Sequence, residues 1–168
     1  MTDNSHGDPD VMGTIAVWRA LGDIADPELP AVSIVELGIA RGVACTSNEC
    51  VVTLTPTYTG CPAIRAIEAD VRSALAKITN APLRVVTLLT PPWSSDWIAP
   101  EAREELARYG VAPPARVVQW SDRSQPVIDC PNCGSSNTEE LSRFGSTACK
   151  AQYRCRDCRE PFEYVKAH

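Results

Sequence analysis

The sequence predicts an α+β fold, with a two-layer α-β-β-α-β domain followed by a small C-terminal zinc ribbon. Two observations support this. Segments with helical apolar spacing alternate with short β-rich runs, and two Cys-x-x-Cys pairs follow them. We expect a polar tail at 1–10, the α+β domain at 11–120, a linker at 121–128 and the ribbon at 129–168.

The composition limits the class of protein. An apolar fraction of 44% and a charged fraction of 22% are typical of a soluble globular chain, and no apolar run is long enough for a bilayer span. The polar start has no export signal, so eight cysteines indicate metal or redox chemistry rather than a disulfide framework. A net charge of −5 is not a nucleic-acid footprint. We therefore expect a cytoplasmic protein with no membrane segment and no nucleic-acid partner.

The first element is a helix. Apolar residues recur at helical spacing from Val11 to Leu21. This helix must end by Asp26, because Pro27 disfavours helical backbone in the residue before it.

A hairpin follows the helix. The runs 32–45 and 50–57 are rich in β-forming residues, and the turn-like "TSNE" joins them. Cys45 and Cys50 flank this turn, and we interpret them as ordinary strand residues.

Three further elements complete the domain. One face of the next helix carries Ile64, Ile67, Val71, Leu75 and Ile78. "LRVVTLL" at 83–89 is expected to be a buried strand. "APEAREELARYG" is a short helix with Pro100 in its first turn and Gly110 as its terminator. The expected order is α-β-β-α-β-α, with the helices on one face of a small sheet.

The C-terminal module contains a four-thiolate metal motif. The four predicted ligands are Cys130, Cys133, Cys155 and Cys158. Each Cys-x-x-Cys turn aims two thiolates at one point. Gly134 supplies the left-handed backbone that such a knuckle needs, whereas Arg159 makes the second knuckle less ideal. A module this small needs a metal to fold, so structural Zn²⁺ is favoured over a redox or cluster-carrying iron.

Two other features of the module remain open. Cys149 lacks knuckle spacing, and is either a small packed thiol or a cluster-binding thiol close to the knuckle. A basic cluster near the metal is either a solvated face or a docking surface for an acidic protein. Its members are Lys150, Arg154, Arg156 and Arg159.

Cys61 is the cysteine most suited to chemistry. Gly60 lets the chain bend, and Pro62 suits the first turn of the helix that follows. A thiol at a helix N-terminus is expected to favour the thiolate. The alternative is a cysteine that only packs there.

Asp26 and Glu28 lie in a loop stiffened by Pro27 and Pro30. Such a loop can present carboxylates to a ligand. The alternative is a helix-stopping turn with solvated acids.

Three motifs together resemble a known family. They are "DPELP…SIVELGI", "VTLTPTYTGCP" and "PPWSSDWIAPEAREELARYGV", spanning roughly 11–115. The chain resembles the domain shared by eukaryotic cytosolic iron–sulfur targeting factors and bacterial SufT proteins. The C-terminal cysteine segment makes it similar to the PaaD (PaaJ) family, accessory proteins of phenylacetyl-CoA epoxygenases.

The resemblance implies an accessory protein rather than an enzyme, with no catalytic residue. Its role would be to mature or insert the iron–sulfur or diiron centre of the epoxygenase complex in phenylacetate degradation. The implied partners are the phenylacetyl-CoA oxygenase or its iron–sulfur reductase subunit. The family motif maps onto Asp26, Glu28, Thr57, Gly60 and Cys61.

The resemblance also implies a transient iron–sulfur cluster or iron at Cys61, beside the structural Zn²⁺ of the ribbon. One thiol per chain cannot complete a cluster site. A homodimer or a partner's thiols would be needed, and Cys149 is the second candidate within this chain.

Three other functions are alternatives. A structural accessory subunit of the oxygenase would need no metal transfer. A zinc-ribbon nucleic-acid binder is disfavoured by the acidity of the main domain. A thiol enzyme at Cys61 would want a histidine base, and neither His6 nor His168 is placed for that role.

Overall fold

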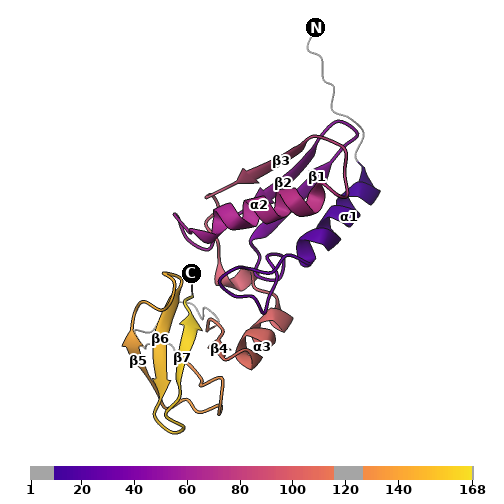
Figure 1. The fold of residues 1–168 in the computed structure, drawn as a ribbon. Helices are drawn as coiled ribbons and strands as arrows, with labels where there is room; N and C mark the ends of the chain where they lie inside the picture. The colour runs from indigo at the N-terminus through magenta and orange to yellow at the C-terminus, as the bar shows by residue number, and fades with distance from the viewer. Residues whose placement is uncertain (1–9, 116–126, 168) are drawn as a thin grey trace. The chain divides into compact units, whose positions relative to one another are not determined.

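The computed structural model describes residues 10–115 and 127–167. The chain forms two compact units, Met1–Trp93 and Ser94–His168 (Figure 1). The division falls earlier than the expected linker at 121–128. Most of that linker, like most of the expected 1–10 tail, lies outside the described residues. The predicted α+β class is confirmed, with helices and two small sheets.

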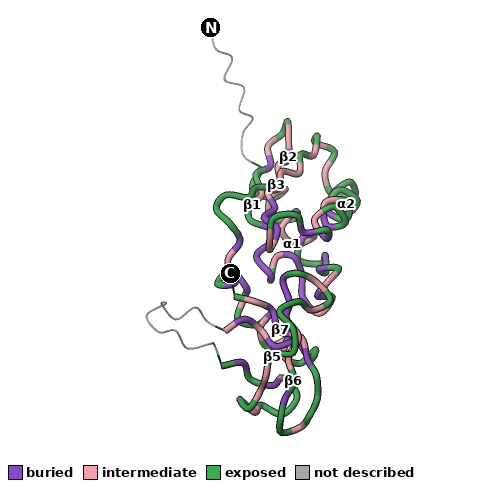
Figure 2. Tube along the Cα trace, turned by 90° about the vertical axis from the view of Figure 1, so that its left-hand side faces the viewer, coloured by how far each residue is buried: buried purple, intermediate pink, exposed green. Residues whose placement is uncertain are grey.

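The first unit is a three-stranded sheet with two helices. Its elements are α1 (Val11–Gly22), β1 (Ala40–Cys45), β2 (Cys50–Leu54), α2 (Ala63–Leu75) and β3 (Leu83–Thr87). The strand order is β1-β2-β3, with β1 antiparallel and β3 parallel to β2. Both helices lie on the same side of this sheet, as the two views in Figures 1 and 2 show.

The core of this unit follows the two-residue period of a strand and the 3.6-residue period of a helix. Every second residue of β2 is buried, which places Val52 and Leu54 on the helix-covered face. Helix α2 buries one stripe, including Ile67 and Val71. Burying a side chain of this size stabilises the fold by about 1.5–3 kcal/mol. Helix α1 adds Val17, which is fully buried.

Two strand predictions were partly wrong. Only Ala40–Cys45 of the expected run 32–45 is a strand. The residues before it form turns, in which the Ser33 backbone N–H and hydroxyl donate to Glu36 Oε2 at 2.8 and 2.7 Å. These local hydrogen bonds compete with sheet pairing.

The other error concerns "LRVVTLL", which was expected to be buried. Strand β3 is only half-buried, and Leu88 and Leu89 beyond it are 43% and 51% exposed. The reason is its position at the edge of the sheet. Ile78, expected on the apolar face of α2, lies beyond the end of that helix and is exposed.

The second unit pairs a helix with a ribbon sheet. Its elements are η1 (Ser95–Trp97), α3 (Pro100–Arg108), β4 (Val111–Ala112), β5 (Thr138–Ser142), β6 (Lys150–Cys155) and β7 (Pro161–Val165). The strand order is β4-β7-β6-β5, and only the β4–β7 pair is parallel. Gly110 follows α3 with φ 89°, so it is the terminator that the sequence predicts.

The ribbon has a small core. Its aromatic centre is Tyr153, whose ring centroid lies 5.9 Å from that of Phe162 and 5.5 Å from that of Tyr164. The buried members are Ala112, Ile128, Cys130, Ala151, Cys155, Phe162 and Tyr164. Across the part of the chain that the structure describes, no helix has the length and apolarity needed to cross a membrane.

Candidate metal centre and thiol site

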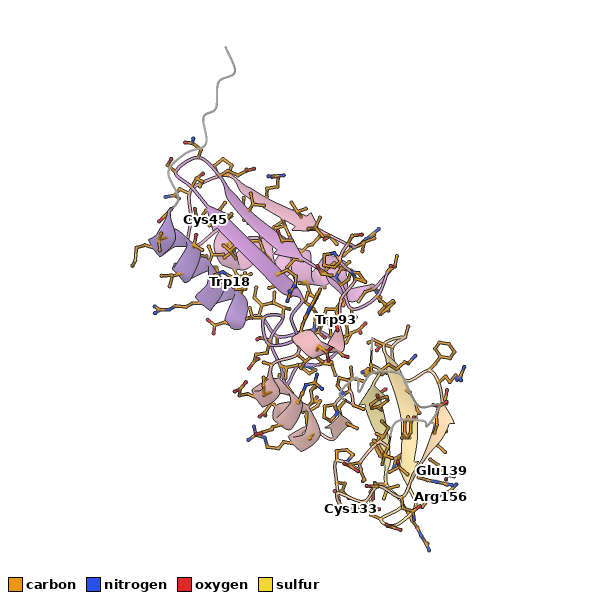
Figure 3. All side chains as sticks on the ribbon, turned by 180° about the vertical axis from the view of Figure 1, so that it is seen from behind. Trp18, Cys45, Trp93, Cys133, Glu139 and Arg156 are labelled. Carbon is orange, nitrogen blue, oxygen red and sulfur yellow. A yellow bond between two sulfur atoms is a disulfide. The ribbon has the colours of Figure 1, made fainter. Side chains whose placement is uncertain are left out.

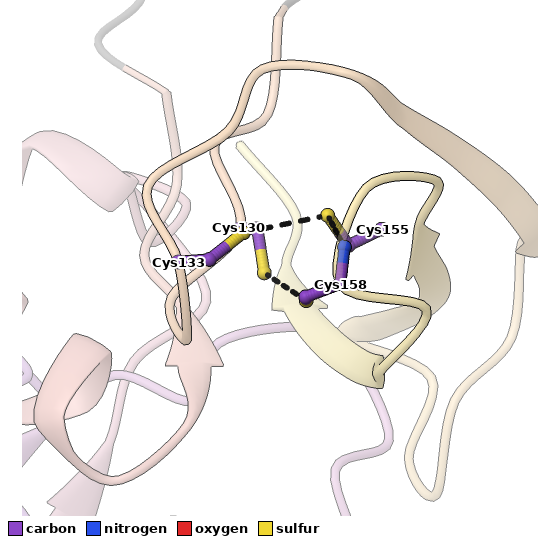
Figure 4. Close-up of side chains that lie close together, drawn as sticks. All are labelled: Cys130, Cys133, Cys155 and Cys158. Atoms are coloured by element: carbon purple, nitrogen blue, oxygen red, sulfur yellow. Dashed lines mark hydrogen bonds between the residues drawn. The ribbon is translucent and has the colours of Figure 1, made fainter.

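Four cysteines meet at one end of the ribbon. The first pair comes from the turn before β5, and the second from the turn that joins β6 to β7. Figure 4 shows the four side chains converging, and all four sulfur atoms lie within 4.8 Å of one another. The Sγ atoms of Cys130 and Cys158 are 3.7 Å apart, and those of Cys133 and Cys155 are 3.6 Å apart. The predicted ligand set is therefore assembled.

This geometry fits zinc. A Zn–S bond of about 2.3 Å gives a tetrahedron with edges of about 3.8 Å, close to both sulfur–sulfur distances. Four thiolates and no open position are typical of a structural site. When bound, the ion would supply folding free energy and no chemistry of its own.

The backbone of both knuckles is left-handed after the second cysteine. Gly134 has φ 74°, and its N–H donates to Cys130 O at 2.8 Å. Arg159 has φ 68°. This left-handed backbone is unfavourable for any residue that has a Cβ atom. The second knuckle thus has the same turn as the first in spite of its less suitable residue.

The ligand thiols differ in acidity. The Ser135 N–H favours the Cys133 thiolate, but contact with the other three sulfur atoms and desolvation raise the pKa of Cys133 to about 12. The Glu160 N–H, helped by Asn132, lowers the pKa of Cys158 to about 7. Four thiolates this close repel one another, so a cation is needed to ionise them together.

Cys149 lies away from this centre. It precedes β6, whereas Cys155 ends that strand. Six residues of extended chain span about 20 Å, so the expectation that Cys149 is close to the knuckle was wrong. The thiol is 5% exposed and lies 3.1 Å from the Thr147 hydroxyl. The packed-thiol interpretation fits this position.

The expected basic cluster is divided by the fold. Lys150 is buried, and its ammonium lies 2.8 Å from Glu163 Oε2. Arg154 and Arg156 both bind Glu139, which lowers the pKa of that carboxyl. Figure 3 shows Arg156 beside Glu139. The pairing of the exposed Arg154 and Arg156 with Glu139 fits the solvated-face interpretation better than a docking surface, whereas the buried Lys150 belongs to neither.

Cys61 lies at the N-terminus of α2, as predicted. Gly60 turns the chain with φ 88°, and Pro62 occupies the position just before the first residue of the helix. The side chain is 8% exposed, and the backbone N–H groups of Ala63 and Ile64 act to lower the pKa of its thiol. A buried thiol facing the N–H groups of a helix start is the arrangement that the sequence indicated.

The expected preference for thiolate was wrong. Desolvation by burial raises the pKa of Cys61 above its usual value, although the Ala63 N–H acts against it. The charges of Glu28 and Asp26 raise the pKa further. The helix terminus is therefore outweighed, and the thiol is protonated at neutral pH.

The structure brings both predicted carboxylates near Cys61. Asp26 is 5% exposed, and its Oδ1 accepts from the N–H groups of Glu28 and Leu29 at 2.9 and 2.8 Å. Asp26 thus shapes the loop that carries Glu28. Thr57 and Gly60 belong to the loop that leads into Cys61. The candidate thiol site therefore lies in the first unit and the metal centre in the second.

Sequence reasoning missed a disulfide. Cys45 and Cys50 are directly paired across the β1–β2 hairpin, with Cα atoms 4.0 Å apart, and their sulfur atoms are bonded. The interpretation as ordinary strand residues was wrong. The signal was available, because a four-residue turn between two cysteines can place them opposite each other.

Comparison with known proteins divides the chain at similar places. Residues 15–82 match the family described as "Iron-sulfur cluster assembly protein", and residues 114–166 match the "PaaD zinc beta ribbon domain". The first match contains Asp26, Glu28 and Cys61, and the second contains all four ribbon cysteines.

Two relatives are similar to this chain. A protein of Escherichia coli (strain K12), described as one of the subunits of a 1,2-phenylacetyl-CoA epoxidase, is 44% identical over 150 residues, which is 89% of this chain and 90% of that protein. A crystal structure of a DUF59 domain from Bacillus anthracis is 31% identical, with a TM-score of 0.52. It covers 56% of this chain and 92% of its own.

Proposed function

This chain belongs to the PaaD family of phenylacetyl-CoA epoxidase subunits, and on that premise we propose that it matures the metal centre of the epoxidase. It would act as an accessory factor and would not catalyse the epoxidation. Its cargo is iron or an iron–sulfur cluster, received at Cys61 and passed to the oxygenase or to its iron–sulfur reductase subunit. The likeness of residues 15–82 to iron–sulfur assembly proteins supports this role.

The observation that carries the proposal is the position of Cys61. Its thiol is buried beside the N–H groups of the helix start and within electrostatic reach of Asp26 and Glu28. Two carboxylates that disfavour the thiolate favour a cation instead. An arriving iron centre would neutralise them and allow the thiol to ionise as it binds.

The ligand count requires a partner. Iron–sulfur clusters are held by four cysteine thiolates, and among the described cysteines only Cys61 belongs to this site. A second copy of the chain or the client would supply the others. A site that is incomplete in one chain releases its cargo more readily than a closed one.

A second candidate is a structural accessory subunit that transfers no metal. The small exposed fraction of Cys61, 8%, together with its raised pKa favours this alternative, because a buried protonated thiol is a poor ligand. The two functions differ in whether iron depends on Cys61.

The test is metal and acid-labile sulfide analysis of protein purified without oxygen. We expect zinc in every sample, with iron and sulfide in the wild type and lost in Cys61→Ala. Cys149→Ala is the matched control, because Cys149 is also a buried cysteine outside any disulfide, 5% exposed, but lies just before strand β6 in the other unit.

Equal iron and sulfide in wild type and Cys61→Ala would contradict the role of this thiol. Absence of both from all three proteins, together with full epoxidase activity of Cys61→Ala, would support the structural subunit instead. Loss of iron in Cys149→Ala alone would assign the ligand to that residue.

A further inference from the structure

The two knuckles of the ribbon are joined by side chains that the Cys-x-x-Cys motif does not include. Asp157 lies between the two cysteines of the second knuckle, and its carboxylate faces the first. Its Oδ2 accepts from the Ser135 hydroxyl, and its Oδ1 accepts from the Asn137 amide at 2.8 Å. Ser135 and Asn137 closely follow the first knuckle, so one carboxylate ties both metal-binding turns together.

The backbone strengthens this connection. The Ser135 hydroxyl also accepts from the Asn137 N–H at 3.0 Å, and the Ser135 carbonyl accepts from the Cys130 N–H at 2.9 Å. The Arg156 N–H donates to Asn137 O at 2.8 Å. The carboxylate of Asp157 is therefore the centre of a network that reaches Cys130 of the first pair and Arg156, which follows Cys155 of the second.

A reciprocal contact comes from the first knuckle. The Asn132 side-chain amide lies 3.7 Å from Cys158 Sγ, as a donor to that sulfur atom. Each knuckle thus sends one side chain from between its own cysteines toward the other. Hydrogen bonds of this kind orient metal ligands and raise metal affinity.

We propose that Asp157 is a positioning residue that holds the two thiol pairs at ligand distance before the metal binds and slows the release of the metal afterwards. The ribbon metal is then a resident ion rather than cargo. This goes beyond the proposed function, since it holds whether or not Cys61 carries iron. Ser135 and Asn137 act through the same carboxylate.

The negative charge of Asp157 alone does not account for the positioning role that we propose. A carboxylate hydrogen bond is stronger than a neutral one, and Asp157 accepts two of them. Asn at this position can accept through one oxygen only, and therefore loses one of the two hydrogen bonds.

Asp129 is the charge-matched control. It is also exposed, lies next to a ligand cysteine, and accepts a hydroxyl hydrogen bond from Ser136 at 2.6 Å. Asp129 and Ser136 both flank the first knuckle, so the hydrogen bond between them does not connect the two knuckles. Asp129→Asn removes the same charge as Asp157→Asn without loosening the two turns.

The experiment measures the rate at which the zinc-loaded full-length protein transfers its metal to an excess of a chromophoric chelator. Loss of the hydrogen bonds that orient metal ligands typically costs about 10–100-fold in metal affinity. We expect Asp157→Asn to release zinc roughly 10-fold faster than the wild type and Asp157→Ala faster still. Asp129→Asn should stay within about two-fold.

Ser135→Ala provides a test without any charge change. It should also accelerate release. The double variant with Asp157→Ala should be no faster than Asp157→Ala alone, because Asp157→Ala already removes the hydrogen bond that Ser135→Ala removes. Equal release rates for Asp157→Asn and Asp129→Asn would overturn the proposal. So would additive effects of the Ser135 and Asp157 substitutions.

Discussion

At Cys61 two physical effects act in opposite directions. The helix N–H groups stabilise a thiolate, whereas burial and the charges of Glu28 and Asp26 disfavour it. The balance raises the pKa of Cys61 above its ordinary value, so the thiol stays in its neutral form. A site arranged in this way favours the arrival of a cation over attack on an electrophile, which agrees with an accessory role.

The acidity of Cys61 can be measured by alkylation. Iodoacetamide reacts with thiolate, so a raised pKa predicts slow labelling at pH 7 and a rate that keeps rising above pH 9. Peptide-resolved mass spectrometry follows Cys61 apart from the ribbon cysteines. Glu28→Gln removes one of the charges that disfavour the thiolate, and should shift the profile to lower pH. A labelling profile with its midpoint below that of a free cysteine would contradict the assignment.

The residue scale also shows where local reasoning fails. The position of Cys61 at a helix start could be predicted from Gly60 and Pro62, because the chemistry of a turn is local. Its burial and the approach of Asp26 and Glu28 could not, because they depend on a loop more than thirty residues earlier in the chain.

At the scale of elements, the two knuckles share one backbone conformation but have different residues at the left-handed position. Gly134 and Arg159 occupy equivalent left-handed positions, with φ 74° and 68°. An ideal Cβ at Gly134 would meet nothing within 4 Å, so the cost of a side chain there is conformational rather than steric.

This pair predicts opposite changes in stability. Arg159→Gly should raise the free energy of unfolding of the zinc-loaded ribbon by roughly 1 kcal/mol, because glycine adopts positive φ without strain. Gly134→Ala should lower it by roughly the same amount. Denaturant unfolding followed by tyrosine fluorescence measures both, since Tyr153 and Tyr164 pack in the ribbon core. A destabilised Arg159→Gly protein would show instead that the Arg159 side chain makes a stabilising contact.

Elements were predicted best where their signal was strong and local. The apolar stripe of α2 was confirmed for Ile67, Val71 and Leu75, and the terminator of α3 was confirmed as well. The strand predicted over 32–39 was wrong because the Ser33 N–H and hydroxyl donate hydrogen bonds to Glu36 within a turn. The β propensity of single residues does not predict such local hydrogen bonds. The exposure of β3 was missed because edge and central strands are alike in composition.

At the scale of the whole molecule, the chain has two compact units with different sources of stability. The first buries a continuous apolar layer between two helices and a sheet. The second has a small core beside four cysteines. Structural zinc contributes about 10–16 kcal/mol in small modules, so the ribbon should depend on its metal and the first unit should not.

Zinc removal should therefore unfold one unit selectively. In a strong chelator, we expect amide hydrogens of β5, β6 and β7 to exchange rapidly while those of α2 and β2 keep their protection. Hydrogen-exchange mass spectrometry of the full-length protein resolves the two, and re-addition of zinc should restore the ribbon. Unchanged protection of β6 after complete zinc removal would contradict a structural role for the metal.

The sequence by itself determined the α+β class, the four cysteines that gather in the ribbon and the position of Cys61 before α2. Each Cys-x-x-Cys turn and the helix start at Cys61 rest on short spacings, which the chain expresses locally whatever lies around them. Tertiary structure alone decided that Cys61 is protonated beside two carboxylates, that Cys149 is remote from the knuckles, and that Asp157 ties them together. Burial, desolvation and contacts across the sheet depend on residues far apart in the chain, and only folding brings these together.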